Sequence, residues 1–372
     1  MLSQRARERY ARQLVLPGFG EEVQKKLLDS SVLIIGAGGL GSPSSLYLAA
    51  AGFGRIGIID ADAVDLSNLH RQILFTEDDI GRDKVDVAAE RLRRLSPDAR
   101  IEPLHLRLTS ENALEIFSGY DMIIDGSDNF ATRYLTNDAA VMTGKPLVAG
   151  TIFRFEGQLS VFNYKGGPCY RCLFPEPPAA GTVPDCAEGG VVGALPGTIG
   201  SMQAIEAIKI AGEIGEPLAG RLLIYDALMA STRSLTFSRD PDCPVCGDAP
   251  EITKLIDYEA FCGMPATDIE EISAVDVAAM LENGNAPFLL DVRQPFEWEM
   301  ASIGGTLIPL DTLEDNVDQI PRDRDVIAIC RSGQRSAEAT RILQRHGFDR
   351  VKNLEGGLKK WRTDVDPSMR DY

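Results

Sequence analysis

The stretch Ser31-Val-Leu-Ile-Ile-Gly-Ala-Gly-Gly-Leu-Gly41 decides the fold of the first half of the chain. Its opening apolar run predicts a buried strand, and its glycines predict a tight turn at the end of that strand. The alanine-rich residues 44–51 predict a helix, and Arg55-Ile-Gly-Ile-Ile-Asp60 predicts a second strand that ends in an acid. This order of strand, turn, helix and strand opens a parallel, doubly wound α/β sheet.

The chain continues this pattern as far as residue 225. Apolar residues at helical spacing predict a helix over 83–95. Further apolar runs predict strands at 120–125, 146–150, 158–162 and 221–225. We therefore expect a Rossmann-like first domain that binds its ligand at the carboxyl ends of the parallel strands.

A change of composition predicts a linker and a second domain. Prolines 241, 244, 250 and 265 interrupt regular structure, so we place the first domain at 1–248, a semi-flexible linker at 249–270 and the second domain at 271–372. Beyond the linker a helix is predicted from Ser273, with Asp276 as its capping partner. Strands at 288–292 and 325–330 and a helix at 334–346 follow. The second domain is therefore expected to be a smaller α/β unit.

Charge and composition exclude several functions. The 372 residues carry 38 Lys and Arg against 55 Asp and Glu, a formal net charge of −17. Such a chain lacks the broad basic field that attracts nucleic acid or an anionic membrane. Residues 1–19 hold no signal-type apolar core, and no apolar run reaches the roughly 18 residues of a membrane span. We expect a soluble, cytoplasmic protein with no nucleic-acid or membrane partner.

The glycine turn predicts a nucleotide site. Glycines at 36, 38, 39 and 41 let the backbone approach a phosphate and aim the amides of a helix N-terminus at it. Asp60 lies 19 residues beyond Gly41, where a carboxylate can accept hydrogen bonds from ribose hydroxyls. This pattern alone fits a nicotinamide or flavin enzyme, an ATP-using enzyme or a purely structural turn.

Charged residues after the next strands favour ATP. Arg71 and Lys84 can neutralise phosphates in a way that a dinucleotide site rarely requires. The run Asp125-Gly-Ser-Asp-Asn129 places two acids and an amide at the carboxyl end of a predicted strand. Asp128 could hold a Mg²⁺ ion that bridges phosphates. Each of these charges, taken alone, also fits a solvated surface.

The seven cysteines, an odd number with uneven spacing, argue against a disulfide scaffold. Cys169-Tyr-Arg-Cys172 and Cys243-Pro-Val-Cys246 are two Cys-x-x-Cys pairs far apart in the sequence. Four thiolates in a tetrahedral set suit Zn²⁺ and leave no open coordination position, which predicts a structural zinc site. The alternative is a pair of redox motifs or free thiols.

Cys330 ends an apolar strand and is followed by Arg331-Ser-Gly-Gln-Arg-Ser336 and a predicted helix. A short loop in this position can direct its N–H groups at one sulfur atom. Those donors, the helix dipole and the charge of Arg331 or Arg335 would stabilise a thiolate or a persulfide anion. A buried cysteine without chemistry is the alternative for Cys330, and it is our interpretation of Cys262.

Four motifs together resemble those of MoeB and ThiF, the bacterial relatives of ubiquitin-activating enzymes. They are Gly36-Ala-Gly-Gly-Leu-Gly41, Ser67-Asn-Leu-His-Arg-Gln72, Gly126-Ser-Asp-Asn129 and Arg154-Phe-Glu-Gly-Gln158. The resemblance implies an enzyme that uses ATP to adenylate the C-terminal glycine of a small ubiquitin-like sulfur-carrier protein. The ATP site that it implies is made by Gly39, Asp60, Ser67, Asn68, Arg71, Lys84, Asp128 and Asn129.

The same resemblance implies roles for Arg12 and Cys186. Arg12 matches an arginine that reaches into the site of a neighbouring protomer, which implies a homodimer. Cys186 matches a crossover-loop cysteine that forms a thioester, or a disulfide with a transferred sulfur. His70 stands where MoeB has Gln, and we assign no role to it.

A second resemblance covers about 270–366. Asp291-Val-Arg293, Glu297-Trp298, the Cys330 loop and Glu355-Gly-Gly-Leu-Lys-Lys-Trp361 are similar to the motifs of a single-domain rhodanese. Ala301-Ser-Ile-Gly-Gly305 departs from the usual His-bearing segment, which leaves the catalytic loop unaffected. The resemblance implies that Cys330 carries a persulfide. The whole chain is similar to the MoeZ-type fusions of MoeB with rhodanese.

Together the resemblances predict adenylation of a carrier of the MoaD or ThiS type, which ends in Gly-Gly, followed by sulfur transfer. A sulfur donor such as a cysteine desulfurase would load Cys330, and Cys186 would release the thiocarboxylate. Molybdenum cofactor synthesis is favoured over thiamine synthesis as the pathway. The alternatives are an activator for protein conjugation through a Cys186 thioester, a dinucleotide-dependent oxidoreductase and a non-enzymatic scaffold.

Overall fold

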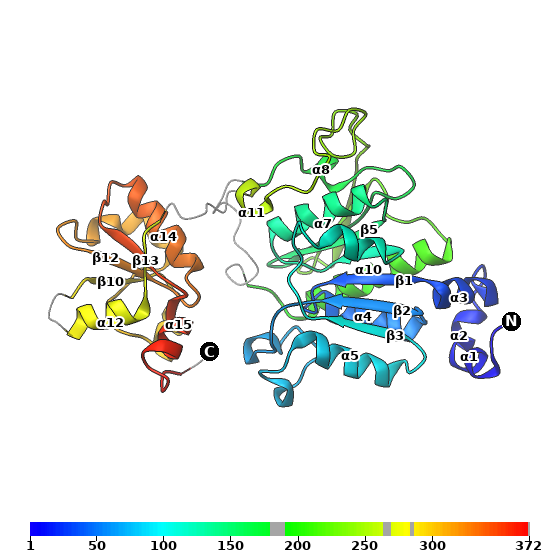
Figure 1. Ribbon diagram of the computed structural model, residues 1–372, viewed down its shortest axis with the longest axis horizontal. Helices are drawn as coiled ribbons and strands as arrows, with labels where there is room; N and C mark the ends of the chain where they lie inside the picture. Colours follow the sequence, from blue (N-terminus) through cyan, green and yellow to red (C-terminus); the bar gives the residue numbers. More distant parts are fainter. Residues whose placement is uncertain (179–189, 263–268, 283–285, 371–372) are drawn as a thin grey trace. The chain divides into compact units, whose positions relative to one another are not determined.

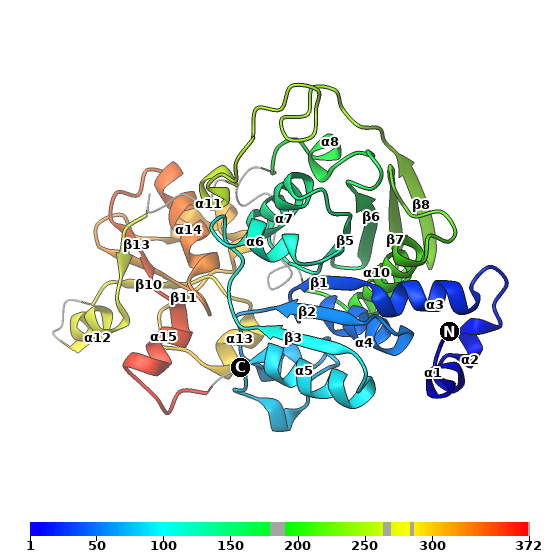
Figure 2. The same cartoon turned by 45° about the vertical axis from the view of Figure 1, so that its right-hand side comes forward.

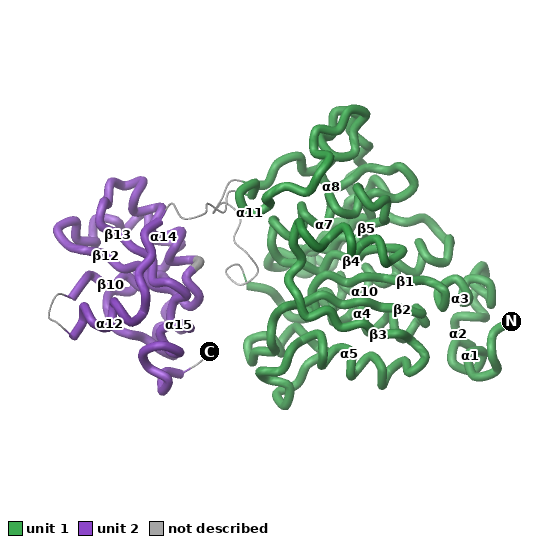
Figure 3. Tube along the Cα trace, viewed as in Figure 1, with its two compact units in different colours: residues 1–264 green, residues 265–372 purple. Residues whose placement is uncertain are grey.

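The computed structural model describes residues 1–178, 190–262, 269–282 and 286–370. The chain forms two compact units, Met1–Met264 and Pro265–Tyr372, each built around a sheet of its own (Figure 3). Along the described residues, no helix combines the length and the apolar character that crossing a membrane requires. Both units are α/β, as the sequence predicts.

The first unit contains an eight-stranded sheet with the order β3-β2-β1-β4-β5-β6-β7-β8. Its strands are β1 (Ser31–Ile35), β2 (Arg55–Ile59), β3 (Arg100–Leu104), β4 (Met122–Asp125), β5 (Leu147–Phe153), β6 (Glu156–Phe162), β7 (Arg221–Asp226) and β8 (Ser231–Thr236). The five strands from β3 to β5 run parallel, and β6, β7 and β8 continue the sheet antiparallel. The parallel half is the doubly wound arrangement that the glycine turn predicts.

Helices cover both faces of this sheet (Figure 1, Figure 2). They are α1 (Gln4–Arg9), α2 (Ala11–Leu14), α3 (Gly20–Asp29), α4 (Gly41–Ala51), α5 (Lys84–Leu95), α6 (Ala113–Ser118), α7 (Phe130–Met142), α8 (Tyr170–Leu173), α10 (Ala194–Gly212) and α11 (Tyr258–Phe261). Val32 and Ile34 of β1 pack in a core with α4, α5 and α10, whereas Leu33 and Ile35 pack in a core with α6 and α7. Because successive strand residues point to opposite faces, an unbroken apolar strand is buried on both.

The turn between β1 and α4 requires glycine at two positions. Gly36 has φ +89°, which residues with a side chain rarely adopt, and a Cβ on Gly41 would lie 1.8 Å from the Gly36 carbonyl oxygen. A Cβ on Gly36 would also lie 3.2 Å from the carbonyl oxygen of Gly126, in the loop after β4. The turn therefore lies directly against the end of β4.

The second unit contains a five-stranded parallel sheet with the order β11-β10-β12-β13-β9. Its strands are β9 (Glu271–Ile272), β10 (Phe288–Asp291), β11 (Thr306–Leu307), β12 (Val326–Ile329) and β13 (Val351–Leu354), and its helices are α12 (Ala274–Glu282), α13 (Pro295–Met300), α14 (Gln334–Arg345) and α15 (Gly357–Asp364). Ala328 packs with α14 on one face of β12, and Ile327 packs with α12 and α15 on the other. Cys330 directly follows β12, at the carboxyl edge of this sheet.

Local patterns predicted eight of the described strands, and they missed β3, β8, β9, β11 and β13. The predicted cap of α12 is present, since the Asp276 N–H donates to Ser273 Oγ at 3.1 Å. The strand β3 was missed because it contains Pro103 and alternates with charged Arg100 and Glu102. The strand β8 was missed because it is exposed along its whole length and carries no apolar alternation.

The end of the first unit differs from the boundary predicted at residue 248. The described residues 252–262, which the sequence places in the linker, belong to the first unit, and Tyr258 of α11 is 4% exposed. Prolines 241, 244 and 250 therefore lie in an irregular part of the first unit and not in a tether. The extent of a linker within 263–270 stays a prediction.

Replacing Gly41 with Ala should destabilise the first unit by about 3 kcal/mol, because a backbone atom has to move to admit the new methyl group. Gly38→Ala is the matched control, since its Cβ would meet nothing closer than Gln72 Nε2 at 3.7 Å. Urea denaturation followed by far-UV circular dichroism measures both variants. Equal stability of the two variants would contradict the close approach at Gly41.

Candidate functional site

The carboxyl ends of β1 and β2 bring the glycine turn and Asp60 together. The Ala37 N–H of the turn donates to Asp60 Oδ2 at 2.8 Å, and the Asp62 N–H donates to Asp60 Oδ1 at 2.8 Å. Burial raises the pKa of the Asp60 carboxyl, and the charge of Lys84 opposes that rise. Asp60 therefore ties the turn to the loop after β2, where the sequence predicts a ribose partner.

Lys84 begins α5 beside this loop. Its Nζ lies 2.9 Å from Asp62 Oδ2, and its N–H donates to the Asp62 carbonyl oxygen at 3.0 Å. The lysine side chain is 7% exposed, whereas that of Asp62 is 73% exposed. The ammonium group is thus held in a largely buried position by a carboxylate that reaches solvent and can leave it.

Arg71 follows the short 3₁₀ helix η1 (Leu66–Asn68). Asp65 begins η1 by accepting the Ser67 N–H at 2.8 Å, and Arg71 Nη1 folds back to donate to the Ser67 carbonyl oxygen at 2.9 Å. The Cγ of Arg71 would lie 3.6 Å from a Cβ on Gly39, so the arginine lies beside the glycine turn. The structure therefore brings Gly39, Asp60, Arg71 and Lys84 to one edge of the sheet.

His70 contacts Arg71 directly. Its Nε2 lies 2.8 Å from Arg71 Nη1, and because a guanidinium only donates, Nε2 accepts this hydrogen bond. Burial and the neighbouring charge of Arg71 lower the pKa of His70, which favours the neutral ring. The sequence assigned no role to this residue.

The residues after β4 divide between the surface and the core. Asp128 is exposed, and the Asn129 side chain accepts the Thr132 N–H at 2.8 Å, so Asn129 is the N-cap of α7. Asp125 lies beneath them, fully buried, and burial raises its pKa although Arg133 Nε approaches to 3.9 Å. Gln203 of α10 donates to the Asp125 carbonyl oxygen at 2.6 Å. Sequence patterns missed Gln203 because it lies 78 residues away along the chain.

Two predicted residues are not placed at this edge. Arg12 is an exposed residue of α2, and its neighbour Gln13 donates to the carbonyl oxygen of Ala51, at the far end of α4 from the glycine turn. Within the described chain Arg12 therefore lies away from the turn. Cys186 lies outside the described residues.

The two Cys-x-x-Cys pairs converge on one cluster. The sulfur atoms of Cys169, Cys172, Cys243 and Cys246 all lie within 4.8 Å of one another. The Sγ separations are 3.6 Å for Cys169 and Cys243 and 3.9 Å for Cys169 and Cys172. Four thiolates that bind one metal at about 2.3 Å in a tetrahedron would be separated by about 3.8 Å. The donor set therefore fits a metal ion with no open coordination position.

Cys330 lies in a loop that directs donors at its sulfur. The Gly333 N–H lies 3.1 Å from Cys330 Sγ, and the Ser336 hydroxyl donates to the same atom at 3.2 Å. Gly333 has φ +92°, which bends the loop around the sulfur. A Cβ on Gly357 would lie 2.4 Å from the Cys330 carbonyl oxygen, so the start of α15 closes against the loop. These contacts give the sulfur two donors that would stabilise an anion.

Arg335, which the sequence offers as an alternative to Arg331 beside the thiol, pairs with a carboxylate. Arg335 Nη1 and Nη2 each lie 2.7 Å from an oxygen of Glu297, a bidentate pair across 38 residues of sequence. Arg293 makes a comparable buried pair with Asp291, at 2.8 Å and 2.6 Å. The pair of Arg335 with Glu297 joins the start of α14, just beyond the Cys330 loop, to α13.

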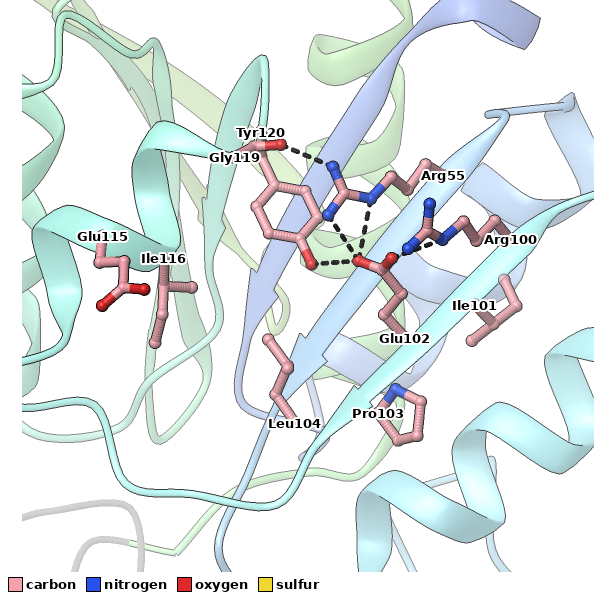
Figure 4. Close-up of a pocket in the computed structure, with 10 residues that line it drawn as sticks. All are labelled: Arg55, Arg100, Ile101, Glu102, Pro103, Leu104, Glu115, Ile116, Gly119 and Tyr120. Atoms are coloured by element: carbon pink, nitrogen blue, oxygen red, sulfur yellow. Dashed lines mark hydrogen bonds and ion pairs between the residues drawn. The ribbon is translucent and has the colours of Figure 1, made fainter.

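A cavity of about 600 Å³ opens along β3, beside Arg55 at the start of β2, and its lining contains none of the predicted site residues (Figure 4). Its charged side chains satisfy one another, since Glu102 accepts Arg55 Nε at 2.9 Å and the Tyr120 hydroxyl at 2.7 Å. Burial raises the pKa of Tyr120. In open α/β sheets ligands bind at the carboxyl ends of strands, so we assign no chemistry to this cavity.

Comparison with known protein families identifies both units. The ThiF family matches residues 10–245. The chain belongs to the ThiF family. The rhodanese-like domain matches residues 273–364, and it covers Cys330, its loop and α15. This member of the ThiF family therefore carries a C-terminal rhodanese domain, the combination that the sequence motifs predict.

Two curated relatives cover this chain widely. The protein named probable adenylyltransferase/sulfurtransferase MoeZ from Mycobacterium tuberculosis is 45% identical over 384 residues, with 100% of this chain and 96% of the relative covered. The sulfur carrier protein adenylyltransferase of Thermus thermophilus is 56% identical over 262 residues, with 69% of this chain and 97% of the relative covered.

One solved structure shows the fold of the first unit alone. The crystal structure of MccB from E. coli has a TM-score of 0.59 and 23% sequence identity, and the match covers 65% of this chain and 73% of MccB. At this identity the likeness supports the ThiF-type sheet and carries nothing about substrates.

Replacing Glu297 with Gln should destabilise the rhodanese unit most at neutral pH. Burial alone would raise the pKa of Glu297, but the hydrogen bonds and charge of Arg335 outweigh burial and lower it. A carboxyl with a lowered pKa stabilises the fold above its unfolded pKa of about 4.3, and this contribution is lost as the pH falls through the folded pKa. We expect a loss of about 3 kcal/mol at neutral pH that shrinks in acid.

The tryptophans report this change selectively. Both tryptophans of the chain, Trp298 and Trp361, belong to the second unit, so their emission during urea titration follows that unit alone. Glu299→Gln removes an exposed charge from the same helix and serves as the control. If Glu297→Gln is as stable as Glu299→Gln at neutral pH, the pair of Glu297 with Arg335 contributes nothing to the stability of the rhodanese unit.

Proposed function

We propose that the chain adenylates the C-terminal glycine of a small ubiquitin-like sulfur-carrier protein and then converts it to a thiocarboxylate with persulfide sulfur. The observation that carries the proposal is the presence of a ThiF match and a rhodanese-like match in one chain. The relative named adenylyltransferase/sulfurtransferase MoeZ covers both matches, and the Thermus relative is named for a sulfur-carrier substrate. The ThiF match covers the glycine turn, which leaves the oxidoreductase alternative without support.

In the first step, a carboxylate oxygen of the carrier attacks the α-phosphorus of ATP. A bond forms between the carboxylate and the phosphorus, and pyrophosphate leaves with the electrons of the broken bond. Two anions have to approach each other, so nearby cations lower the barrier by offsetting their repulsion. We assign this role to Arg71 and Lys84, with Asp60 as the partner of the ribose.

The remaining residues of the proposed ATP site hold the nucleotide. The site consists of Gly39, Asp60, Ser67, Asn68, Arg71, Lys84, Asp128 and Asn129. Lys84 supports the assignment because its present partner, Asp62, is exposed and can yield the ammonium to a phosphate. Asp128, exposed at the same edge, would hold a Mg²⁺ ion that neutralises phosphate charge.

In the second step, sulfur replaces AMP. A sulfur donor such as a cysteine desulfurase first loads Cys330 with sulfane sulfur. The terminal persulfide sulfur attacks the carrier carbonyl carbon, and AMP leaves with the electron pair of its acyl bond. The Gly333 N–H and the Ser336 hydroxyl support this role because both are directed at Cys330 Sγ.

A second thiolate releases the product. We assign it to Cys186, which attacks Cys330 Sγ and expels the carrier as a thiocarboxylate. A disulfide between Cys186 and Cys330 remains, and an external thiol reduces it. This assignment distinguishes the proposal from a conjugation activator, in which Cys186 would itself hold the carrier as a thioester.

The cysteine cluster is assigned to structural Zn²⁺. Four thiolates without an open position hold a zinc ion closed to substrate, and the ion would join α8 to residues 243–246. Arg12, which lies away from the site of its own chain, is assigned to the site of a second protomer in a homodimer. The free thiols fit a reducing, cytoplasmic compartment.

Arg71→Ala should lower carrier-dependent exchange of pyrophosphate into ATP by about a hundredfold, because the positive charge beside the attacked phosphorus is lost. The assay uses a purified carrier that ends in Gly-Gly, with the full-length enzyme. Arg94→Ala, which removes an exposed arginine from α5, is the control and should exchange normally. Normal exchange by Arg71→Ala would remove this residue from the site.

Cys330→Ala should retain pyrophosphate exchange and lose thiocarboxylate formation, because adenylation does not need the persulfide. Intact mass spectrometry of the carrier detects the replacement of one oxygen by sulfur. Cys262→Ala is the matched control, since Cys262 is a buried thiol of the first unit whose pKa burial raises to about 11. Thiocarboxylate formed at the wild-type rate by Cys330→Ala would refute the persulfide role.

A further inference from the structure

A buried polar cluster joins α7, α8 and α11. Arg171 Nε and Nη2 lie 2.9 Å and 2.8 Å from the two carboxylate oxygens of Asp138, a bidentate pair in which both side chains are at most 1% exposed. The Tyr258 hydroxyl donates to Asp138 Oδ2 at 2.8 Å. One buried carboxylate is therefore shared by an arginine from α8 and a tyrosine from α11.

The same guanidinium also contacts aromatic rings. Arg171 Cζ lies 4.4 Å from the ring centre of Phe261 and 4.8 Å from that of Tyr134. The rings of Tyr134 and Phe261 meet edge to face at 5.2 Å. Cation–π contacts are strongest where water is excluded, as it is here. Both ends of α11, Tyr258 and Phe261, are thus held by Arg171 and its partner carboxylate.

The polar cluster lies close in sequence to the end of the first unit. Arg171 lies between Cys169 and Cys172, so its backbone belongs to the cysteine cluster. α11 ends at Phe261, and the second unit begins at Pro265. The cluster therefore holds the last described residues of the first unit before the chain passes to the rhodanese unit.

We propose that Asp138, Arg171 and Tyr258 form an anchor that sets the length of chain between the two units. This length then limits the rate of sulfur transfer from Cys330. The inference rests on the proposed function, because only sulfur transfer requires Cys330 to meet the adenylate. With α11 anchored, seven peptide units separate Cys262 from Ile269. Without the anchor, the last backbone contact with the rest of the first unit is the Ile256 carbonyl oxygen, which accepts the Ser110 hydroxyl at 2.7 Å, and thirteen peptide units separate Ile256 from Ile269.

The length of chain between the two units limits how often Cys330 meets the acyl-adenylate. Seven extended peptide units span at most about 24 Å, whereas thirteen span about 45 Å. The effective concentration of a tethered partner falls as about the −3/2 power of tether length, so releasing α11 lowers it about 2.5-fold. Adenylation takes place within the first unit and does not depend on this length.

The test compares full-length variants that release α11 to different degrees. The double variant Tyr258→Ala/Phe261→Ala removes both contacts of α11, whereas Tyr258→Phe removes only the hydroxyl and keeps the packing of the ring. Tyr47→Ala, which removes an exposed tyrosine from α4, is the control. Hydrogen–deuterium exchange of residues 252–262 reports whether α11 has been released. Pyrophosphate exchange reports adenylation, and single-turnover transfer from preloaded Cys330 persulfide reports sulfur delivery.

We expect the double variant to exchange residues 252–262 faster, to retain pyrophosphate exchange and to transfer sulfur about 2.5-fold more slowly. Tyr258→Phe should lie between it and Tyr47→Ala, and it keeps the test valid if the double variant misfolds. Free sulfide, a nucleophile that needs no tether, should restore equal thiocarboxylate formation in all variants.

Two results would overturn the anchor. The first is unchanged sulfur transfer in a variant whose residues 252–262 exchange faster, and the second is a deficit that persists with free sulfide. Failure of the proposed function looks different, because the wild-type protein itself would then form no thiocarboxylate from Cys330 persulfide.

Discussion

The close approach of Gly41 to the carbonyl oxygen of Gly36 is the contact on which the proposed ATP site depends. It lets the end of β1 turn sharply into α4 and lie against the loop after β4. Asp60 then accepts a backbone N–H of the turn, and Arg71 lies alongside Gly39. A side chain at Gly41 would separate these elements, so the position of the reacting groups follows from the absence of one Cβ atom.

The hydrogen-bond partners of the basic side chains distinguish cations that stabilise the fold from cations that can bind a nucleotide. Arg171, Arg293 and Arg335 each make a bidentate pair with a carboxylate that is at most 8% exposed, so their charges serve the fold. Arg71 Nη1 is met by a carbonyl oxygen and an imidazole nitrogen, and Lys84 is met by an exposed carboxylate. In a chain of net charge −17, such weakly matched cations are what an anionic nucleotide needs.

Short-range patterns in the sequence were enough to predict the parallel strands β1, β2, β4, β5, β10 and β12, the glycine turn, the cysteine cluster and the loop after Cys330. Interactions across many residues were not predictable, because spacing along the chain does not show which side chains meet. The pair of Arg335 with Glu297 and the contact of Tyr258 with Asp138 are of this kind. The second contact also explains why residues 252–262, which carry no strong periodicity, belong to the first unit and not to a linker.

The central claim is that a carrier carboxylate attacks the α-phosphorus of ATP before sulfur replaces the nucleotide. The most direct measurement uses a carrier whose terminal carboxylate is labelled with oxygen-18, turned over with ATP and a sulfur donor by the full-length protein. If the carboxylate attacks first, the AMP released with each thiocarboxylate carries one labelled oxygen. Label in inorganic phosphate, or AMP without label, would contradict this claim.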